Sequence, residues 1–225
     1  MSTYVKKRGE LEEYFDRTAA QTWARLTSDA PVSGVRAKVR AGRDAMRATL
    51  LSWLPEDMTG LTLLDAGCGT GALALEAARR GAQVTAIDIS PTLVGLAAER
   101  SAGHPRLDFR VGDMLDPALG RFDHIVAMDS LIHYRADDVA HALGGLAARA
   151  NLSVAFTFAP ATPLLNTVWV VGKMFPKKDR SPAIEPTGHG RLKRLLVRDR
   201  GLVMGRDKRI SRAFYISHAQ EIRTA

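Results

Sequence analysis

A glycine-rich turn offers the clearest chemistry in the sequence. An apolar run at 61–64 leads into Asp65, and glycines follow at alternate positions, Gly67, Gly69 and Gly71. The run is typical of a buried parallel strand, and the leucines and alanines after the turn indicate a helix. Because glycine has no Cβ, a strand–turn–helix unit of this kind lets backbone approach a nucleotide-like ligand closely. The spacing is tighter than a dinucleotide-binding Gly-x-Gly-x-x-Gly, and no Lys-Ser or Lys-Thr of a phosphate-binding loop follows.

Aspartates accompany the ends of the next three expected strands. The strands at 83–88, 107–111 and 122–128 end in, or run directly into, Asp88, Asp113 and Asp129. An acidic residue at the end of the second strand is placed to accept the hydroxyls of a ribose. The carboxyl ends of parallel strands meet at one edge of a sheet, where ligands bind. We therefore expect the three aspartates and the glycine turn to form one site.

This combination resembles the S-adenosylmethionine-dependent methyltransferases with a Rossmann-like fold. The resemblance implies an α/β architecture, with a seven-stranded, mostly parallel sheet, helices on both faces and an antiparallel last strand. Alternating strands and helices alone indicate only a doubly wound α/β sheet. The resemblance further implies S-adenosylmethionine as cofactor, with Asp113 holding the adenine amino group. The implied cofactor-binding residues are Asp65, Gly67, Cys68, Gly69, Gly71, Asp88, Ile89, Asp113, Met114 and Asp129.

Two other interpretations of this site are possible in principle: a different cofactor and a catalytic cysteine. NAD is the main rival cofactor, but the short glycine spacing and the Gly112-Asp113-Met114 sequence after the third strand argue against it. Cys68 lies within the glycine turn. We interpret it as a small residue that fits the turn rather than as a catalytic thiol.

The stretch after the fourth strand carries the best side chains for handling an acceptor. His133 and Tyr134 are our candidate catalytic residues, able to orient an acceptor, move a proton or ligate a metal. A histidine that only caps or packs is the competing interpretation of His133. A nucleophile that is already anionic needs no strong base, whereas a phenol or an amine does.

Composition limits the classes of protein to consider. The chain has 225 residues, of which 46% are hydrophobic and 25% charged, as expected for one globular α/β domain with a small elaboration. Cys68 is the single cysteine, which excludes an internal disulfide and a cysteine-based metal site, and we expect no resident metal. No run approaches the roughly 18–20 apolar residues that span a bilayer, and the polar N-terminus has no secretory signal. These features predict a cytoplasmic protein.

The net charge of +8 is concentrated near the C-terminus, where residues 172–225 carry 14 basic and 5 acidic residues. Such a segment can meet nucleic acid, an anionic membrane surface or an acidic partner. A solvated basic face is the equally weighted alternative.

The chain divides into three expected parts. Residues 1–58 form an N-terminal helical cover with helices at 8–28 and 35–53, and residues 59–160 form the cofactor-binding core. Residues 161–225 add an apolar lid segment at 163–175, a basic helix at 191–200 and closing strands at 203–211 and 212–217.

Several longer pieces narrow the resemblance to the magnesium-protoporphyrin IX O-methyltransferases of bacteriochlorophyll and chlorophyll biosynthesis. The specific pieces are Glu13-Tyr-Phe-Asp16 with Trp23 and Arg25, Leu131-Ile-His-Tyr134, and Phe214-Tyr-Ile-Ser217; Arg40-Ala-Gly-Arg43 and Phe158-Ala-Pro160 also match. The resemblance implies methyl transfer to a propionate carboxylate of magnesium-protoporphyrin IX, giving the monomethyl ester. Aromatic residues of the N-terminal cover, Tyr14, Phe15 and Trp23, would then contact the flat macrocycle. His133 would ligate its magnesium or orient its carboxylate.

One position departs from the family pattern, because Thr27 stands where oxygenic relatives usually carry a tyrosine. Tyr14 or Tyr134 would have to replace any role of that phenol. The resemblance also implies hand-over of the hydrophobic substrate from magnesium chelatase. The apolar segment 163–175 beside the basic segment favours weak association with the inner, photosynthetic membrane.

Three other functions compete with this one. A quinone-pathway methyltransferase shares the fold and cofactor, but would need a base for a phenolic or carbon acceptor. A nucleic-acid methyltransferase fits the basic segment, but the fourth-strand motif has no Asn-Pro-Pro-Tyr-like clamp and no basic-aromatic interleaving follows. We therefore expect no nucleic-acid partner. A non-enzymatic module that senses the cofactor or a porphyrin is the third alternative.

Overall fold

The computed structural model describes residues 3–19, 27, 34–161, 183–212 and 215–224. Seven strands form one sheet in the order β3-β2-β1-β4-β5-β7-β6. The strands are β1 Thr62–Ala66, β2 Gln83–Asp88, β3 Leu107–Val111, β4 Phe122–Ala127, β5 Ala150–Phe158, β6 Val203–Arg212 and β7 Tyr215–Arg223. Strands β1 to β5 pair in parallel, and β7 is antiparallel to both of its neighbours. This arrangement confirms the predicted α/β class and the antiparallel last strand.

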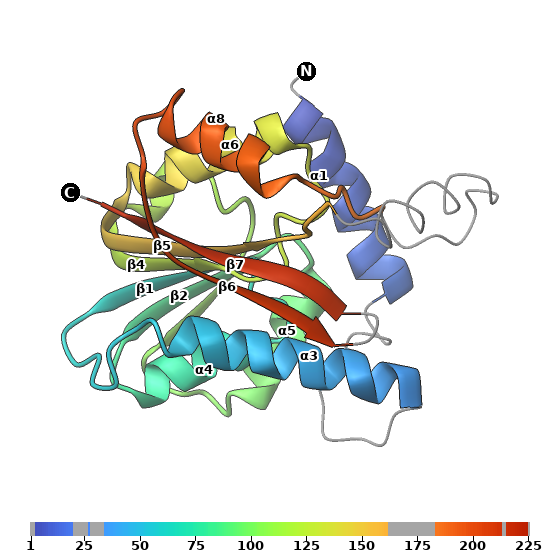
Figure 1. Ribbon diagram of the computed structural model, residues 1–225. Helices are drawn as coiled ribbons and strands as arrows, with labels where there is room; N and C mark the ends of the chain where they lie inside the picture. The colour runs from blue at the N-terminus through green and yellow to red at the C-terminus, as the bar shows by residue number, and fades with distance from the viewer. Residues whose placement is uncertain (1–2, 20–26, 28–33, 162–182, 213–214, 225) are drawn as a thin grey trace.

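Helices cover both faces of the sheet (Figure 1). On one side lie α3 Gly34–Leu51, α4 Ala72–Arg79 and α5 Pro91–Arg100; on the other lie α1 Thr3–Glu13, α6 Ala136–Ala147 and α8 His189–Val197. A π-helix, η1 Tyr14–Ala19, continues α1, and a 3₁₀ turn, η2 Pro117–Leu119, precedes β4.

Two apolar cores hold these layers together. Met46 and Leu50 of α3 pack with Ala74 of α4 under the sheet, whereas Leu143 of α6 and Leu196 of α8 pack above it. All five side chains are fully buried. Burying a leucine or methionine contributes about 1.5–3 kcal/mol. The two cores therefore fix the strand ends that carry the candidate site.

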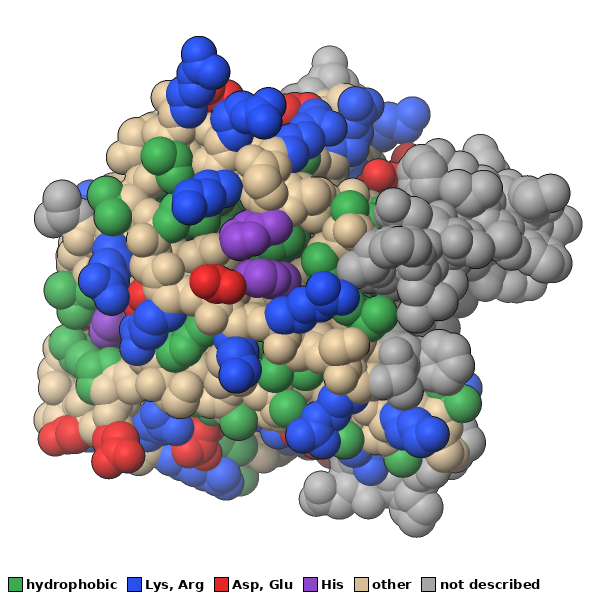
Figure 2. Space-filling view, viewed as in Figure 1, with side chains coloured by type: hydrophobic (Ala, Val, Ile, Leu, Met, Phe, Trp, Pro, Cys, Tyr) green, Lys and Arg blue, Asp and Glu red, His purple; other side chains and the backbone are tan. Residues whose placement is uncertain are grey.

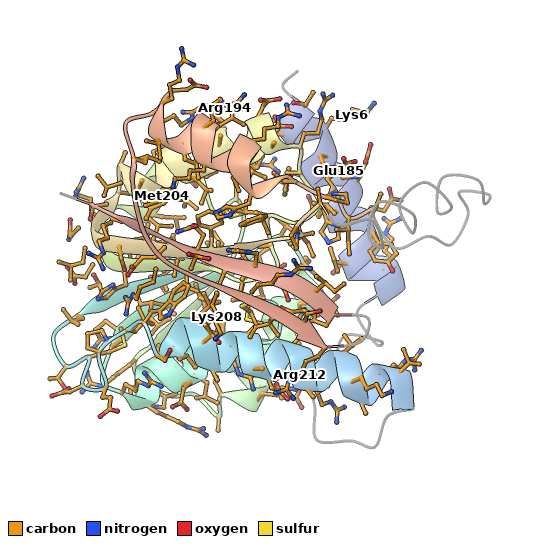
Figure 3. The ribbon with its side chains drawn as sticks, in the orientation of Figure 1. Lys6, Glu185, Arg194, Met204, Lys208 and Arg212 are labelled. Atoms are coloured by element: carbon orange, nitrogen blue, oxygen red, sulfur yellow. The ribbon has the colours of Figure 1, made fainter. Side chains whose placement is uncertain are left out.

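Charged side chains protect the open edge of the sheet. Strand β6 is one of the two edge strands, and Arg206, Asp207, Lys208 and Arg209 on it are exposed. Figure 3 shows Lys208 and Arg212 on β6 on the same face as Arg194 of α8, and Figure 2 shows Lys and Arg side chains spread over this face. Charged edge strands discourage pairing with another chain. Part of the basic segment therefore serves as a solvated, protective edge.

Several predicted bounds differ from the structure; the basic helix predicted at 191–200 is α8, His189–Val197. The first helix begins at Thr3, not at residue 8, because Tyr4 in this polar stretch is buried against the rest of the protein. The last strand runs over Tyr215–Arg223, not 212–217. The polar residues after 217 did not indicate a buried strand. They are buried because Gln220 donates to the carbonyl of Arg206 at 3.1 Å and Glu221 pairs with Arg206.

The strands predicted at 83–88 and 107–111 are confirmed at both ends, and the helix predicted at 35–53 corresponds to α3. The later part of the predicted helix 8–28, apart from Thr27, and the apolar segment 163–175 lie outside the described residues. Within the part of the chain that is described, no helix is both long and apolar enough to cross a membrane.

Candidate functional site

A cavity of about 260 Å³ lies at the carboxyl ends of β1, β2 and β4, between α1 and α3. The predicted site residues that line it are Asp65, Gly67, Cys68, Gly69, Asp88, Ile89, Met114, Asp129, His133, Tyr134 and Phe15. Most residues chosen for cofactor and acceptor binding thus share one cavity. Gly71, Asp113 and Tyr14 do not line it, and Trp23 lies outside the described residues.

The glycine turn has the backbone that its sequence predicts. Gly67, Gly69 and Gly71 have φ values of 89°, 53° and 77°, in the left-handed region that favours glycine. A Cβ at Gly67 would lie 2.3 Å from the Cβ of Ser130, whereas a Cβ at Gly69 would meet nothing within 4 Å. Gly67 thus permits close packing of two loops, and Gly69 leaves an open cradle that faces the cavity.

Asp88 ties the turn to the start of α5. Its Oδ2 accepts the Gly69 N–H at 2.8 Å, and its Oδ1 accepts the Ser90 N–H at 3.0 Å. Burial raises the pKa of Asp88, while these backbone donors favour its charged form. An anchored acceptor at this point in the cavity fits the hydroxyls of a ribose.

Asp65 is a buried acid with one oxygen lacking a partner. The residue is 2% exposed, and no described group hydrogen-bonds its Oδ2. Burial and the charge of Asp88 raise the pKa of Asp65 to about 7. A lone carboxylate oxygen in a cavity fits a ligand that brings a positive charge. The carboxylate acceptors of Asp65 and Asp88 and the open glycine cradle therefore fit S-adenosylmethionine, whose methionine part carries an ammonium group.

Cys68 is held as a neutral thiol. Burial, reinforced by the charges of Asp65 and Asp88, raises its pKa well above the usual value. A thiol in such a place is a poor nucleophile. This environment supports the interpretation of Cys68 as a small residue in the turn.

Asp113 turns its carboxylate away from the cavity toward α1. Its Oδ1 accepts from the Tyr4 hydroxyl at 2.8 Å and from the Leu115 N–H at 2.9 Å, and its Oδ2 pairs with Arg8. The neighbouring Met114 lines the cavity. The structure therefore brings the loop after β3 to the site, but the predicted adenine-binding carboxylate contacts the N-terminal helix.

Asp129 joins four elements at the acceptor side. Its φ of 55° is unusual for a residue other than glycine. Its carboxylate accepts from Arg43 of α3 at 2.9 Å, and from the hydroxyls of Tyr215 and Thr157 at 3.1 Å. A Cβ at Gly42 would lie 2.7 Å from Tyr215, so α3 can approach β7 this closely only because residue 42 is glycine.

His133 and Tyr134 differ in their surroundings. The Nδ1 of His133 lies 3.3 Å from the Ala183 carbonyl, and its ring centre is 5.8 Å from that of Phe15. A carbonyl only accepts, so this contact requires a proton on Nδ1 and makes Nε2 the basic nitrogen. Tyr134 is buried and stacks on Tyr4 at 4.9 Å, and burial raises its pKa. This environment favours a role for Tyr134 in lining the cavity over a role in proton transfer.

Comparison with known proteins identifies the family. A model of the magnesium-protoporphyrin IX methyltransferase C-terminus matches residues 127–224, and a methyltransferase domain model matches residues 63–150. The chain is 49% identical over 225 residues to the magnesium-protoporphyrin O-methyltransferase of Rhodobacter capsulatus, covering 99% of each chain. The chain belongs to the magnesium-protoporphyrin O-methyltransferase family. The Synechocystis member is 29% identical over 94% of each chain.

Solved structures of this family contain the cofactor or its product. The crystal structure of the Synechocystis magnesium protoporphyrin IX methyltransferase with bound SAH superposes with a TM-score of 0.85, at 27% identity, over 96% of this chain and 99% of that one. A second structure of the same protein, with bound SAM, has a TM-score of 0.81 at 25% identity and covers both chains completely. By contrast, the match to a Xanthomonas oryzae ubiquinone biosynthesis O-methyltransferase, at 42% identity, covers 34% of each chain.

Thr27, the departure from the family pattern, also lines the cavity. Its hydroxyl accepts from Arg100 at 3.0 Å. Tyr14 meets Phe15 edge-on at 5.3 Å without lining the cavity. Among the described lining residues the phenols are those of Tyr4 and Tyr134. Of the two tyrosines that could replace the usual one, Tyr14 and Tyr134, it is therefore Tyr134 that lines the cavity.

Sequence reasoning missed the arginines that α3 places in the cavity, Arg40, Arg43 and Arg47. Their spacing of three and four residues put them on one helical face and was a usable signal. Tyr4 and Tyr215 gave no such signal, because each reaches the site through a contact with a residue far away in the sequence.

Proposed function

We propose that this family member transfers the methyl group of S-adenosylmethionine to one propionate carboxylate of magnesium-protoporphyrin IX, giving the monomethyl ester. The supporting observation is that a cofactor cradle at Gly69 and Asp88 opens into the same cavity as His133 and Phe15. Full-length similarity to the Rhodobacter capsulatus enzyme supports the choice of substrate.

The cofactor would be held mainly by the part of the cavity at the ends of β1 and β2. Asp88 would accept the ribose hydroxyls, and the backbone at Gly67 and Gly69 would pass beside the methionine part. Asp65, whose Oδ2 has no hydrogen-bond partner among the described residues, would accept the ammonium group. Ile89 and Met114, which line the cavity, would contact the adenine ring.

The chain's own task is to position the acceptor and exclude water. Bound S-adenosylmethionine would supply a methyl group on a positively charged sulfur. A carboxylate oxygen would attack the methyl carbon as the carbon–sulfur bond breaks, and the electron pair of that bond would stay on sulfur. The attacking carboxylate is already ionised, so no residue needs to remove a proton. Holding two reactants in line can lower a barrier by about 7–11 kcal/mol. The apolar wall of Phe15 and Tyr134 would help desolvate the carboxylate.

His133 has two candidate roles on this surface. Its Nε2 would ligate the magnesium of the substrate, or it would orient the reacting carboxylate. The contact from Nδ1 to the Ala183 carbonyl supports either role, because it fixes the orientation of the ring and the position of its proton.

The proposed reaction is tested by measuring the mass of the porphyrin product. The purified protein would be incubated with S-adenosylmethionine and magnesium-protoporphyrin IX, and in parallel with the metal-free porphyrin. A gain of one methyl on the metallated porphyrin alone is expected if His133 ligates magnesium. Equal methylation of both porphyrins would retain the reaction and assign His133 to the carboxylate. No methylation, with the cofactor still bound, would favour a quinone-type acceptor instead.

Two further partners follow from the insolubility of the macrocycle. We infer that a magnesium chelatase subunit hands over the substrate, and that the basic segment makes a weak contact with an anionic membrane surface. Co-purification with the chelatase subunit in the presence of magnesium-protoporphyrin IX tests the first inference. Flotation with anionic liposomes tests the second, and a protein that stays wholly in the unbound fraction would contradict it.

A further inference from the structure

Asp129 has a strained backbone at the acceptor side of the cavity. Its φ of 55° lies in the left-handed region, which a residue other than glycine keeps only when its surroundings hold it there. The Asp129 N–H donates to the Thr157 hydroxyl at 2.7 Å, and this hydroxyl donates back to Asp129 Oδ1 at 3.1 Å. Arg43 and Tyr215 also donate to the carboxylate. The side chain of Asp129 thus ties its own strained backbone to three neighbours.

The backbone at Asp129 sets the course of the loop that follows it. Ser130, the next residue, packs on the glycine turn, since a Cβ at Gly67 would lie 2.3 Å from the Ser130 Cβ. Three residues later, His133 lines the cavity. Because the backbone turns only about φ and ψ, a change of φ at Asp129 would move both contacts. The conformation of Asp129 therefore sets His133 relative to the cofactor turn.

Tyr215 reaches Asp129 from a fixed position. It is the first residue of β7 and does not itself line the cavity. Its hydroxyl lies 3.1 Å from each of the two carboxylate oxygens. Its ring is buried against α3, where a Cβ at Gly42 would lie 2.7 Å from it. Burial and the charge of Asp129 raise the pKa of Tyr215, so its hydroxyl stays protonated and donates.

The three donors to Asp129 differ in what they can fix. Thr157 lies on β5, next to β4, and its hydroxyl donates to one oxygen, Oδ1. Arg43 donates from a long, flexible side chain that lines the cavity. Tyr215 spans both oxygens from a rigid ring that packing holds in place. Tyr215 is therefore the donor that best fixes the orientation of the carboxylate.

Resting on the proposed function, we infer that Tyr215 is a positioning residue for methyl transfer. Acting through Asp129, its hydroxyl holds the loop at 130–134 so that His133 presents the acceptor in line with the methyl group. This contact governs alignment rather than affinity. A small misplacement of the acceptor lowers the rate strongly, while the cofactor and the porphyrin still bind.

Tyr215→Phe tests the contact, because it removes the hydroxyl and keeps the ring against Gly42. We expect kcat with magnesium-protoporphyrin IX to fall about tenfold. The dissociation constants of S-adenosylhomocysteine, by calorimetry, and of the porphyrin, by fluorescence quenching, should stay within about twofold. A wild-type kcat in Y215F, or a loss that appears only in the two dissociation constants, would overturn the positioning role.

Glu221→Gln is the matched control on the same strand. Glu221 is buried, pairs with Arg206 of β6 and lies about 20 Å along β7 from Tyr215. E221Q should lower the melting temperature at least as much as Y215F but leave kcat within about twofold. If E221Q lowered kcat as much as Y215F, general loosening of β7 would be the cause and the assignment of Tyr215 would fail. Circular dichroism would verify that each variant is folded.

Asp129→Gly gives a second, independent test. Glycine adopts a positive φ without strain, and it has no carboxylate for Tyr215 to hold. In the D129G background, Y215F should therefore change kcat by less than about twofold, whereas independent effects would multiply. A full tenfold loss in that background would overturn the inference that Tyr215 acts through Asp129. The proposed function is judged separately, since its failure would show as absence of methylation by the wild type.

Discussion

The two halves of the cavity are built in different ways. In the cofactor half, the contacts are short in sequence and made by backbone: Asp88 reaches Gly69 across 19 residues and Ser90 across two. In the acceptor half they are long and made by side chains: Arg43 reaches Asp129 across 86 residues, and so does Tyr215. One half is a local supersecondary unit, whereas the other needs the whole fold to assemble.

This difference separates cofactor binding, which many methyltransferases share, from acceptor binding, which is specific to each. A backbone cradle depends on few side chains, so many methyltransferases can share it, and the quinone-pathway match covers about a third of this chain. An acceptor wall made of side chains can be altered one residue at a time without disturbing the cradle. The halves should therefore respond differently to mutation.

Gly67→Ala should have the largest effect and should act on the cofactor half. A Cβ there would lie 2.3 Å from the Ser130 Cβ, on a backbone with φ of 89°. We expect cofactor affinity, measured by calorimetry, to fall at least about hundredfold, because the turn must shift.

Gly60→Ala is the matched control, since Gly60 has φ of 81° but open space around it. Its cofactor affinity should stay within about threefold of the wild type. The double variant G67A/S130G, which removes the opposing Cβ, should recover part of the loss. If G60A were as damaging as G67A, backbone strain rather than packing against Ser130 would be the cause.

Variants of His133 should act on the acceptor half alone. His133→Gln places an amide near the position of Nε2, whereas His133→Asn places one near Nδ1, which contacts the Ala183 carbonyl. We expect kcat to fall about hundredfold in H133N and less in H133Q, because misplacing an acceptor is costly. Cofactor affinity should stay within about twofold in both. The reverse order of the two variants would assign the active role to Nδ1.

The pKa of Asp65 predicts a pH dependence in the cofactor half. Its pKa of about 7 in the folded protein exceeds the usual 3.8, so ionised Asp65 destabilises the fold without cofactor. The free energy of unfolding should therefore fall as pH rises from about 4 to 7 and then level off. A cationic ligand favours the ionised form, so cofactor affinity should rise about tenfold between pH 6 and pH 8. Calorimetry of Asp65→Asn, which should lack this tenfold component, is the control.

The same contrast explains what the sequence could predict. The glycine turn, Asp65 and Asp88 lie within one strand–turn–helix–strand unit, and their spacing alone placed them in the cavity. The placement of Asp129 and His133 also followed from their position after a strand. Each of these predictions depended on where a strand ends, which periodicity and turn chemistry indicate well.

What could not be predicted is which distant side chains meet these residues. Nothing near Asp113 indicates that Tyr4 and Arg8 take its carboxylate, and nothing near Asp129 indicates Tyr215. The polar sequence of β7 does not indicate a buried strand, because Gln220 and Glu221 find their hydrogen-bond and ion-pair partner, Arg206, on β6. Such pairings depend on tertiary packing, which a local pattern does not contain.

The smallest expected effect concerns the carboxylate of Asp113, which contacts the N-terminal helix α1. Tyr4→Phe removes the hydroxyl that donates to Asp113 at 2.8 Å but keeps the ring stacked on Tyr134. We expect the free energy of unfolding to fall by about 1 kcal/mol, and the melting temperature by about 2–4 °C, with cofactor affinity within twofold. Chemical and thermal unfolding measure the first two, and calorimetry the third. A tighter cofactor complex in Y4F, by more than about threefold, would contradict this expectation. It would mean that α1 and the adenine ring compete for Asp113, so that the N-terminal helix belongs to the cofactor half as well.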